Sequence, residues 1–151
     1  MFKTRLLSGI LLVIAALLTI ISGGYVLFVT LLCVSLLGIQ ELYKAMGVHG
    51  ESTGLLEIIG YLGAILYYVS LLLGFESYGL MTVLVSLILI MFVYVFTYPK
   101  YNAHQIMSAF FGVVYVAVML SCIYELRILD KGVYLVWLVF LASWGCDTCA
   151  Y

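Results

Sequence analysis

Two carboxylates stand beside long apolar stretches of the chain, where an ionised side chain is costly. Asp147 follows one such stretch, and Glu57 lies near the start of another. An ionisable group at membrane depth costs at least about 2.5–3.5 kcal/mol, so it usually faces a bundle interior or a wet cavity with a partner. Asp147 is the better candidate for a chemical role. The alternative is a structural carboxylate that snorkels to the interface or accepts a hydrogen bond from a neighbouring helix. For Glu57, a first-turn carboxylate favoured by the helix dipole is the simpler interpretation.

Cysteines and histidines offer weaker candidates. Cys146 and Cys149 form a C-x-x-C pair on one helical face, but a zinc site needs two more ligands and no second pair is present. We interpret both as small buried residues. His49 and His104 fall in predicted loops, where we expect them to be solvated. No nucleophile elbow, glycine-rich phosphate loop or H-E-x-x-H pattern is present.

The composition indicates that lipid surrounds the elements carrying these residues. Of 151 residues, 67% are apolar, while six Lys plus Arg and seven Asp plus Glu carry charge. Soluble domains are about 25% charged, because a surface in water needs polar cover. The net charge of −1 argues against a nucleic-acid partner. The apolar excess argues against disorder, and no repeat or heptad is present. Cys33 and Cys122 lie within apolar runs, so buried free thiols are expected rather than disulfides.

The apolar runs lack the alternation of a β-barrel and predict an all-α integral membrane protein. Since about 20 apolar residues cross the hydrocarbon core, we expect a bundle of about six transmembrane helices forming a single domain over 1–151. The predicted spans are residues 6–21, 25–47, 55–73, 78–97, 105–123 and 132–149. A retained first span is favoured over a signal peptide, because no A-x-A site follows it. A polar turn is expected over 125–131.

Basic residues predict the orientation of these spans. With the N-terminus inside, four fall on the cytoplasmic side and two outside, namely Lys3, Arg5, Lys44 and Lys100 against Arg127 and Lys131. Six spans then return the chain end to the cytoplasm. Asp147 lies 15 residues after Gly132, or about 22 Å of helix, which places it inside the cytoplasmic edge of a roughly 30 Å core. Glu57 is expected at a similar depth on the same side.

Small and aromatic residues predict how the helices pack and where they meet water. Gly60 with Ala64, and Ser108 with Gly112, are small pairs four residues apart that permit close helix contact. An interfacial aromatic belt is expected at one end of the fourth span, formed by Tyr94, Tyr98 and Tyr101.

The last eight residues, from Trp144 to Tyr151, resemble the W-G-x-D-[ST]-x-A-Y stretch of the phosphatidate cytidylyltransferase family. Similar agreement with that family's opening is found at Lys3-Thr4-Arg5, Gly23-Gly24 and Glu41-Leu42-Tyr43. The sequence departs from the family at Cys146 and Cys149, where small residues are usual. The family also continues with a Ser-Pro-Lys-Lys-type segment and a His-Gly-Gly-containing signature. We therefore expect the chain to be a fragment.

The resemblance implies a nucleotidyltransferase that moves CMP from CTP to phosphatidic acid, giving CDP-diacylglycerol and pyrophosphate in phospholipid synthesis. It implies Mg²⁺ as cofactor, Asp147 as catalytic residue and metal ligand, and Thr148 and Tyr151 as substrate-binding residues. The implied location is the cytoplasmic membrane of a bacterium-like cell, and a homodimer is allowed. With few basic residues to hold the phosphates, we expect the 151 residues alone to be inactive.

Two other functions remain open. A small transporter or channel subunit could use Glu57 and Asp147 as an ion path, although both lie toward one face and leave the outer half without polar steps. A non-catalytic membrane scaffold is equally compatible with the small-residue packing pairs. The downstream gene sequence would discriminate, because the family's later signatures must follow if the first interpretation holds.

Overall fold

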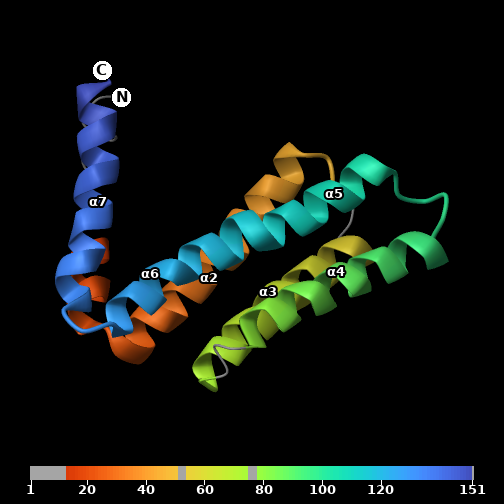
Figure 1. Cartoon of the computed structure of the whole chain (residues 1–151). Helices are drawn as coiled ribbons and strands as arrows, with labels where there is room; N and C mark the ends of the chain where they lie inside the picture. The colour runs from red at the N-terminus through yellow and green to blue at the C-terminus, as the bar shows by residue number, and fades with distance from the viewer. Residues whose placement is uncertain (1–12, 51–53, 75–77, 151) are drawn as a thin grey trace. The chain divides into compact units, whose positions relative to one another are not determined.

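The computed structural model describes residues 13–50, 54–74 and 78–150, and within these ranges the chain is helical without strands. The helices are Val13–Ser22, α2 Gly24–Ala45, α3 Leu55–Leu72, α4 Gly79–Phe96, α5 Ala103–Gly112, a π-helical segment Val113–Val118, α6 Met119–Ile128 and α7 Gly132–Cys149. The last three of the helices before α7 follow one another without a break from Ala103 to Ile128. Figure 1 shows α3 and α4 side by side. The predicted all-α class is confirmed.

Four of the described helices are long and apolar enough to cross a membrane. They are Gly24–Ala45, Leu55–Leu72, Gly79–Phe96 and Ala103–Ile128. Two shorter apolar helices are Val13–Ser22, which overlaps the first predicted span, and Gly132–Asp147, which lies within the last. Residues 6–12 of the first predicted span lie outside the described residues. The protein is therefore a helical membrane protein, because a helix satisfies its own backbone hydrogen bonds in lipid.

The predicted polar turn over 125–131 is wrong in its extent. Helix α6 continues through Glu125 and Arg127 to Ile128, and α7 begins at Gly132 after Lys131, whose φ is +62°. Charged residues do not end a helix, because its backbone groups are paired internally. Arg127 Nε also donates to the carbonyl of Ile20, at 3.3 Å. The arginine thus binds one of the last carbonyls of the first helix, the groups that the helix itself leaves without an internal partner.

The chain divides into two compact units: a terminal unit of residues 1–31 and 122–151, and a central unit of residues 32–121. In the central unit, α3 packs against α4 and against the helix that starts at Ala103. Both predicted small-residue pairs lie in this packing, since Gly60, Ala64, Ser108 and Gly112 are all buried. Their packing role is confirmed.

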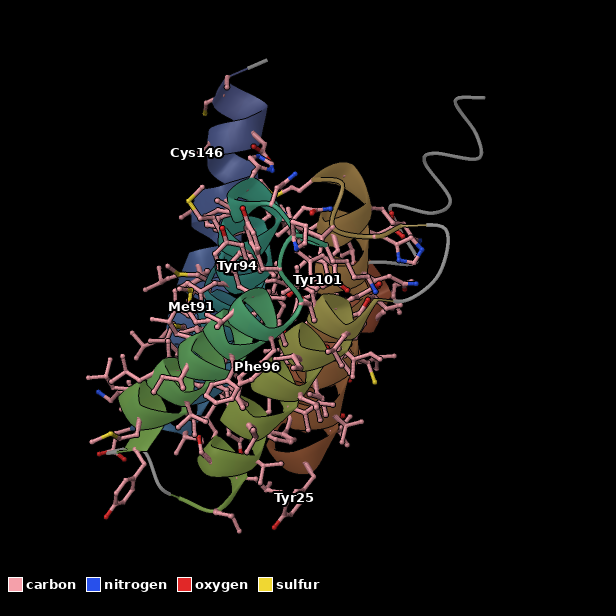
Figure 2. All side chains as sticks on the ribbon, turned by 90° about the vertical axis from the view of Figure 1, so that its right-hand side faces the viewer. Tyr25, Met91, Tyr94, Phe96, Tyr101 and Cys146 are labelled. Atoms are coloured by element: carbon pink, nitrogen blue, oxygen red, sulfur yellow. The ribbon has the colours of Figure 1, made fainter. Side chains whose placement is uncertain are left out.

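Several side chains predicted to be buried or interfacial lie elsewhere. All four cysteines are free, as expected, but exposed, and Figure 2 shows Cys146 pointing away from α7. An apolar surrounding sequence is compatible with facing lipid as well as with burial in protein, which is why the prediction of burial was wrong. Tyr101 is only 7% exposed, so it does not belong to a surface belt, whereas Tyr98 is 71% exposed.

Candidate functional site

Asp147 lies in the last turn of α7, as the sequence predicted. The helix spans Gly132–Cys149 and closes with the amide of Ala150 donating to the carbonyl of Cys146, at 2.9 Å. Asp147 is exposed, and Trp144, one turn earlier, contacts Phe140 edge to face at 5.9 Å between ring centroids. Residues three apart share a helical face, so Trp144 and Asp147 lie on the same side of α7.

The other two predicted site residues are only partly described. Thr148 lies within α7, but its side chain is outside the described part of the structure, and Tyr151 is outside the described residues altogether. Their predicted roles in binding substrate therefore stay predictions.

The carboxylate of Asp147 is a suitable ligand for a hard cation, but it supplies only one of the ligands that such a cation needs. Magnesium is bound by oxygen, usually through one or two carboxylates together with substrate phosphates and water. Among the described residues, Asp147 accepts no hydrogen bond, and no group of three or more acidic, histidine or cysteine side chains could hold a metal. Cys146 and Cys149 are exposed thiols, which favour softer metals. Asp147 can thus supply one carboxylate to such a site and no more.

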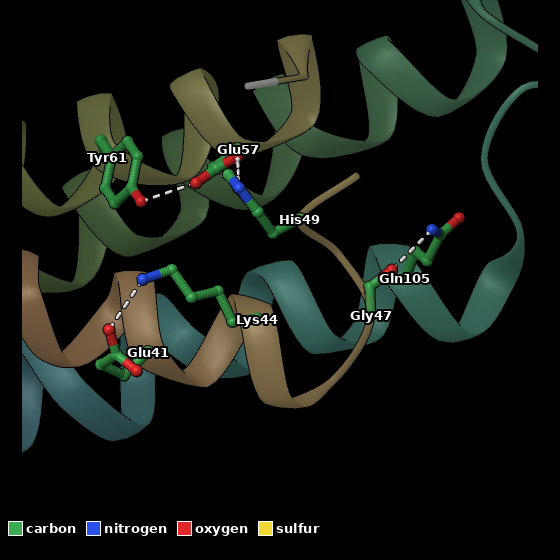
Figure 3. Close-up of polar contacts among 7 residues, drawn as sticks. All are labelled: Glu41, Lys44, Gly47, His49, Glu57, Tyr61 and Gln105. Carbon is green, nitrogen blue, oxygen red and sulfur yellow. Dashed lines mark hydrogen bonds and ion pairs between the residues drawn. The ribbon is translucent and has the colours of Figure 1, made fainter. Parts of the chain in front are cut away.

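A second polar cluster is built around Glu57, which lies in the first turn of α3 as predicted, although the sequence did not predict its hydrogen-bonding partners. The carboxylate is 2% exposed. One oxygen accepts from the hydroxyl of Tyr61 at 2.8 Å, and the other lies 2.9 Å from His49 Nδ1 (Figure 3). Burying a carboxylate is costly unless it is hydrogen-bonded, and here both oxygens are. Solvation of His49 was wrongly predicted, because the connection after α2 brings its imidazole back onto α3.

That connection is held by backbone geometry. After α2, Gly47 adopts φ +69°. The backbone amide of Gly47 donates to the carbonyl of Lys44 at 3.4 Å, and the backbone amide of Val48 donates to the carbonyl of Tyr43 at 2.9 Å. This is the Schellman pattern, which turns a chain sharply at a helix end and favours glycine at the left-handed position. The side-chain amide of Gln105 donates from Nε2 to the Gly47 carbonyl at 2.8 Å (Figure 3).

Tyr43 joins three helices beneath this cluster. Its side chain is fully buried, and its hydroxyl donates to the carbonyl of Ala109 in α5 at 2.8 Å. Its ring lies 5.9 Å from that of Tyr61 and against two helical glycines, Gly60 and Gly112. The sequence carries a partial signal, since Glu41-Leu42-Tyr43 resembles the opening of the family and Gly60 and Gly112 belong to the predicted packing pairs, but no local pattern connects them.

Asp147 lies in the terminal unit and Glu57 in the central unit. The expectation that the two carboxylates approach one membrane interface stays a prediction.

The chain combines helices that are long and apolar enough to span a membrane with an exposed carboxylate, Asp147, in the last turn of α7. It is a membrane protein with a candidate carboxylate ligand for a metal ion. The chain belongs to the cytidylyltransferase family, whose family model matches residues 3–151. It is therefore a CTP-utilising transferase, and the resemblance seen in the last eight residues is confirmed at this level. No curated protein and no solved structure matches the chain.

Proposed function

We propose that the chain is the membrane-embedded part of a phosphatidate cytidylyltransferase. In this reaction a phosphate oxygen of phosphatidic acid attacks the α-phosphorus of CTP. The bond from the α-phosphorus to the oxygen bridging it to the β-phosphorus breaks, pyrophosphate leaves, and CDP-diacylglycerol remains in the membrane.

One observation carries the proposal. The chain matches the cytidylyltransferase family over residues 3–151, and its family-like octet places Asp147, exposed, in the last turn of an apolar helix. A lipid acceptor suits this setting, because the head group of a lipid lies at the interface while CTP arrives from water. A carboxylate at a helix end can reach both. The basic-residue count favours the cytoplasmic side, where CTP is available.

Asp147 is proposed to bind Mg²⁺ or to orient another group that does. When bound, magnesium would neutralise phosphate oxygens and orient the attacking and leaving groups. The Thr148 hydroxyl would donate a hydrogen bond to a substrate phosphate, and Tyr151 would line the pocket. Further carboxylates and basic groups must come from other residues, because Asp147 is the single acid in the octet.

The proposal is tested by following the label from CTP carrying ³²P at its α-phosphate. The complete gene product that contains these residues is reconstituted in phosphatidylcholine vesicles with phosphatidic acid, with diacylglycerol, or with neither. We expect labelled CDP-diacylglycerol only with phosphatidic acid and magnesium. Label transferred to a different lipid acceptor, with none to phosphatidic acid, would show that the substrate is wrong while leaving the family membership intact.

A further inference from the structure

Two cysteine thiols flank the candidate carboxylate at the end of α7. Cys146 directly precedes Asp147, and Cys149 is the last residue of the helix. Both thiols are free and exposed, and Cys146 points away from the helix (Figure 2). The nucleotidyl transfer proposed above uses neither of them.

The helix brings the two cysteines within reach of a disulfide bond. On an α-helix of radius about 2.3 Å, with a rise of about 1.5 Å and a rotation of about 100° per residue, Cα atoms three positions apart are separated by about 5 Å. Disulfides join residues whose Cα atoms lie about 4.4–6.8 Å apart. Because Cys146 and Cys149 belong to one helix, no other element has to move for them to pair.

A disulfide between these positions requires a tighter last turn. Side chains three positions apart on an α-helix have Cβ atoms about 5–6 Å apart, whereas a disulfide holds its two Cβ atoms about 3.5–4.5 Å apart. A 3₁₀ turn provides the closer approach, because residues i and i+3 then lie one above the other. Helix ends commonly take this form, so the change is a small one for the chain.

Nothing packed against the last turn of α7 opposes this change. Cys146, Asp147 and Cys149 are exposed, and a Cβ added at Gly145 would meet no atom within 4 Å. The carbonyl of Cys146 accepts from the amide of Ala150 at 2.9 Å. In a 3₁₀ turn the same carbonyl accepts from the amide of Cys149 instead. The turn can therefore tighten by exchanging one backbone hydrogen bond for another.

A soft metal ion is the other partner that two neighbouring thiols favour. A structural zinc ion takes four ligands, and no group of three or more histidine, cysteine or acidic side chains could hold a metal within the part of the chain that the structure describes. Disulfide formation needs only the two sulfur atoms. The arrangement at Cys146 and Cys149 therefore favours redox chemistry over metal binding.

We propose that Cys146 and Cys149 are a redox modification site, which a small disulfide such as glutathione disulfide oxidises. One cysteine thiol attacks a glutathione sulfur and forms a mixed disulfide, and its proton leaves on the first glutathione thiol. The other cysteine thiol then attacks the protein sulfur of the mixed disulfide, and its proton leaves on the second glutathione thiol. Two cysteine thiols are oxidised and one glutathione disulfide is reduced. Exposed or strained disulfides are easily reduced again, which makes the modification reversible.

The disulfide displaces the Asp147 carboxylate, and its effect on the reaction rests on the proposed function. Between about 3.6 and about 3.0 residues per turn, the rotation from Cys146 to Asp147 rises from about 100° to about 120°. At a side-chain radius of about 5–6 Å, this difference moves the carboxylate by about 2 Å. A misplacement of about 1 Å can cost about 10²-fold in rate. The oxidised protein is therefore switched off by at least about that factor.

The disulfide is measured without reference to activity. The complete gene product that contains these residues, in phosphatidylcholine vesicles with phosphatidic acid, is treated with glutathione disulfide or with dithiothreitol. Free thiols are alkylated, and the peptide containing residues 146–149 is analysed by mass spectrometry. We expect the oxidised peptide to lack two hydrogen atoms and to take up no alkyl group. Cys33 and Cys122 are each the single cysteine of their helix, so they should carry only alkyl or glutathionyl groups.

Activity is measured on the same samples, with variants that separate the pair from the other thiols. We expect oxidation to lower CDP-diacylglycerol formation by about 10²-fold and dithiothreitol to restore it. The combined variant Cys146→Ala with Cys149→Gly should be as active as wild type and insensitive to glutathione disulfide. Cys122→Ala, the matched control, should stay sensitive. Cys149→Ser alone should stop at a mixed disulfide between Cys146 and glutathione.

Three results would overturn the proposal. The first is a peptide over 146–149 that never forms the internal disulfide at any concentration of glutathione disulfide. The second is full transfer by protein whose peptide carries the disulfide. The third is an equal loss of transfer in the combined variant, since oxidation would then act elsewhere. If the reduced protein transferred nothing to phosphatidic acid, the proposed function would fail instead, and the peptide masses would still decide whether the pair is oxidised.

Discussion

Tyr43 is enclosed between helical glycines, and the enclosure can be tested by adding one methyl group. A Cβ built at Gly60 in α3 would collide with the Tyr43 hydroxyl, and one at Gly112 would lie 2.6 Å from Tyr43 Cε1. The Tyr43 ring has no room to move aside, because it is fully buried and its hydroxyl is bonded to Ala109. Gly60→Ala should therefore destabilise the central unit.

The size of the effect follows from three contributions. Overpacking a filled core typically costs about 1–3 kcal/mol. Displacing the Tyr43 hydroxyl loses its hydrogen bond to Ala109, worth about 1 kcal/mol. Alanine in place of glycine within a helix returns about 1 kcal/mol. The expected net loss for Gly60→Ala is about 1–3 kcal/mol, which for a chain of this size lowers the melting temperature by roughly 3–10 °C.

The assay is thermal unfolding of the purified chain in detergent, with Gly79→Ala as the matched control. Gly79 is the first residue of the membrane helix α4, and its added Cβ would meet Tyr67 Cε2 at 3.6 Å, an ordinary contact. Tyr43→Phe combined with Gly60→Ala should be less destabilised than the sum of the single variants, because the hydroxyl is the nearest obstacle. If Gly60→Ala and Gly79→Ala had the same melting temperature, the enclosure of Tyr43 would be refuted.

The remaining predictions concern the candidate site, the topology and the buried acid. In the complete gene product, Asp147→Asn should lower CDP-diacylglycerol formation by about 10²-fold or more without harming membrane insertion, whereas Cys146→Ala and Cys149→Gly should stay near wild type; full turnover in Asp147→Asn would make Asp147 structural. A cysteine at position 51, in a background without the native four, should react with a membrane-impermeant reagent from the cytoplasmic side, and reaction only from outside would reverse the orientation. Glu57→Ala should lower the free energy of unfolding by about 2 kcal/mol, measured by denaturant titration, because it leaves two polar partners of a buried group unpaired; a change within about 0.5 kcal/mol would place the carboxylate in water.

The helical membrane class could be predicted from the sequence because its cause is local. A chain with 67% apolar residues and few charges must face lipid, and lipid requires backbone groups to be paired within each segment. Hydropathy therefore placed the third, fourth and last helices within a residue or two of their ends, at Leu55–Leu72, Gly79–Phe96 and Gly132–Cys149. The family was readable for a similar reason, since its octet is contiguous.

Hydropathy was less informative where a helix leaves the apolar region. It ended the fifth predicted span at 123, whereas the helix runs from Ala103 to Ile128. Backbone pairing, not side-chain polarity, sets how far a helix continues, so Glu125 and Arg127 stay helical. Hydropathy also could not tell lipid-facing from protein-facing positions, which is why exposed Cys33 and Cys122 were expected to be buried.

Only the tertiary structure decided which polar residues meet. His49 reaches Glu57 because Gly47 turns the chain back after α2, and Tyr43 reaches Ala109, 66 residues later, because α2 and α5 pack side by side. None of these pairings leaves a periodic trace in the sequence, since each depends on where another helix stands. The apolar pattern therefore determined that the chain is a helical membrane protein, while packing determined where its buried carboxylate and its central tyrosine lie.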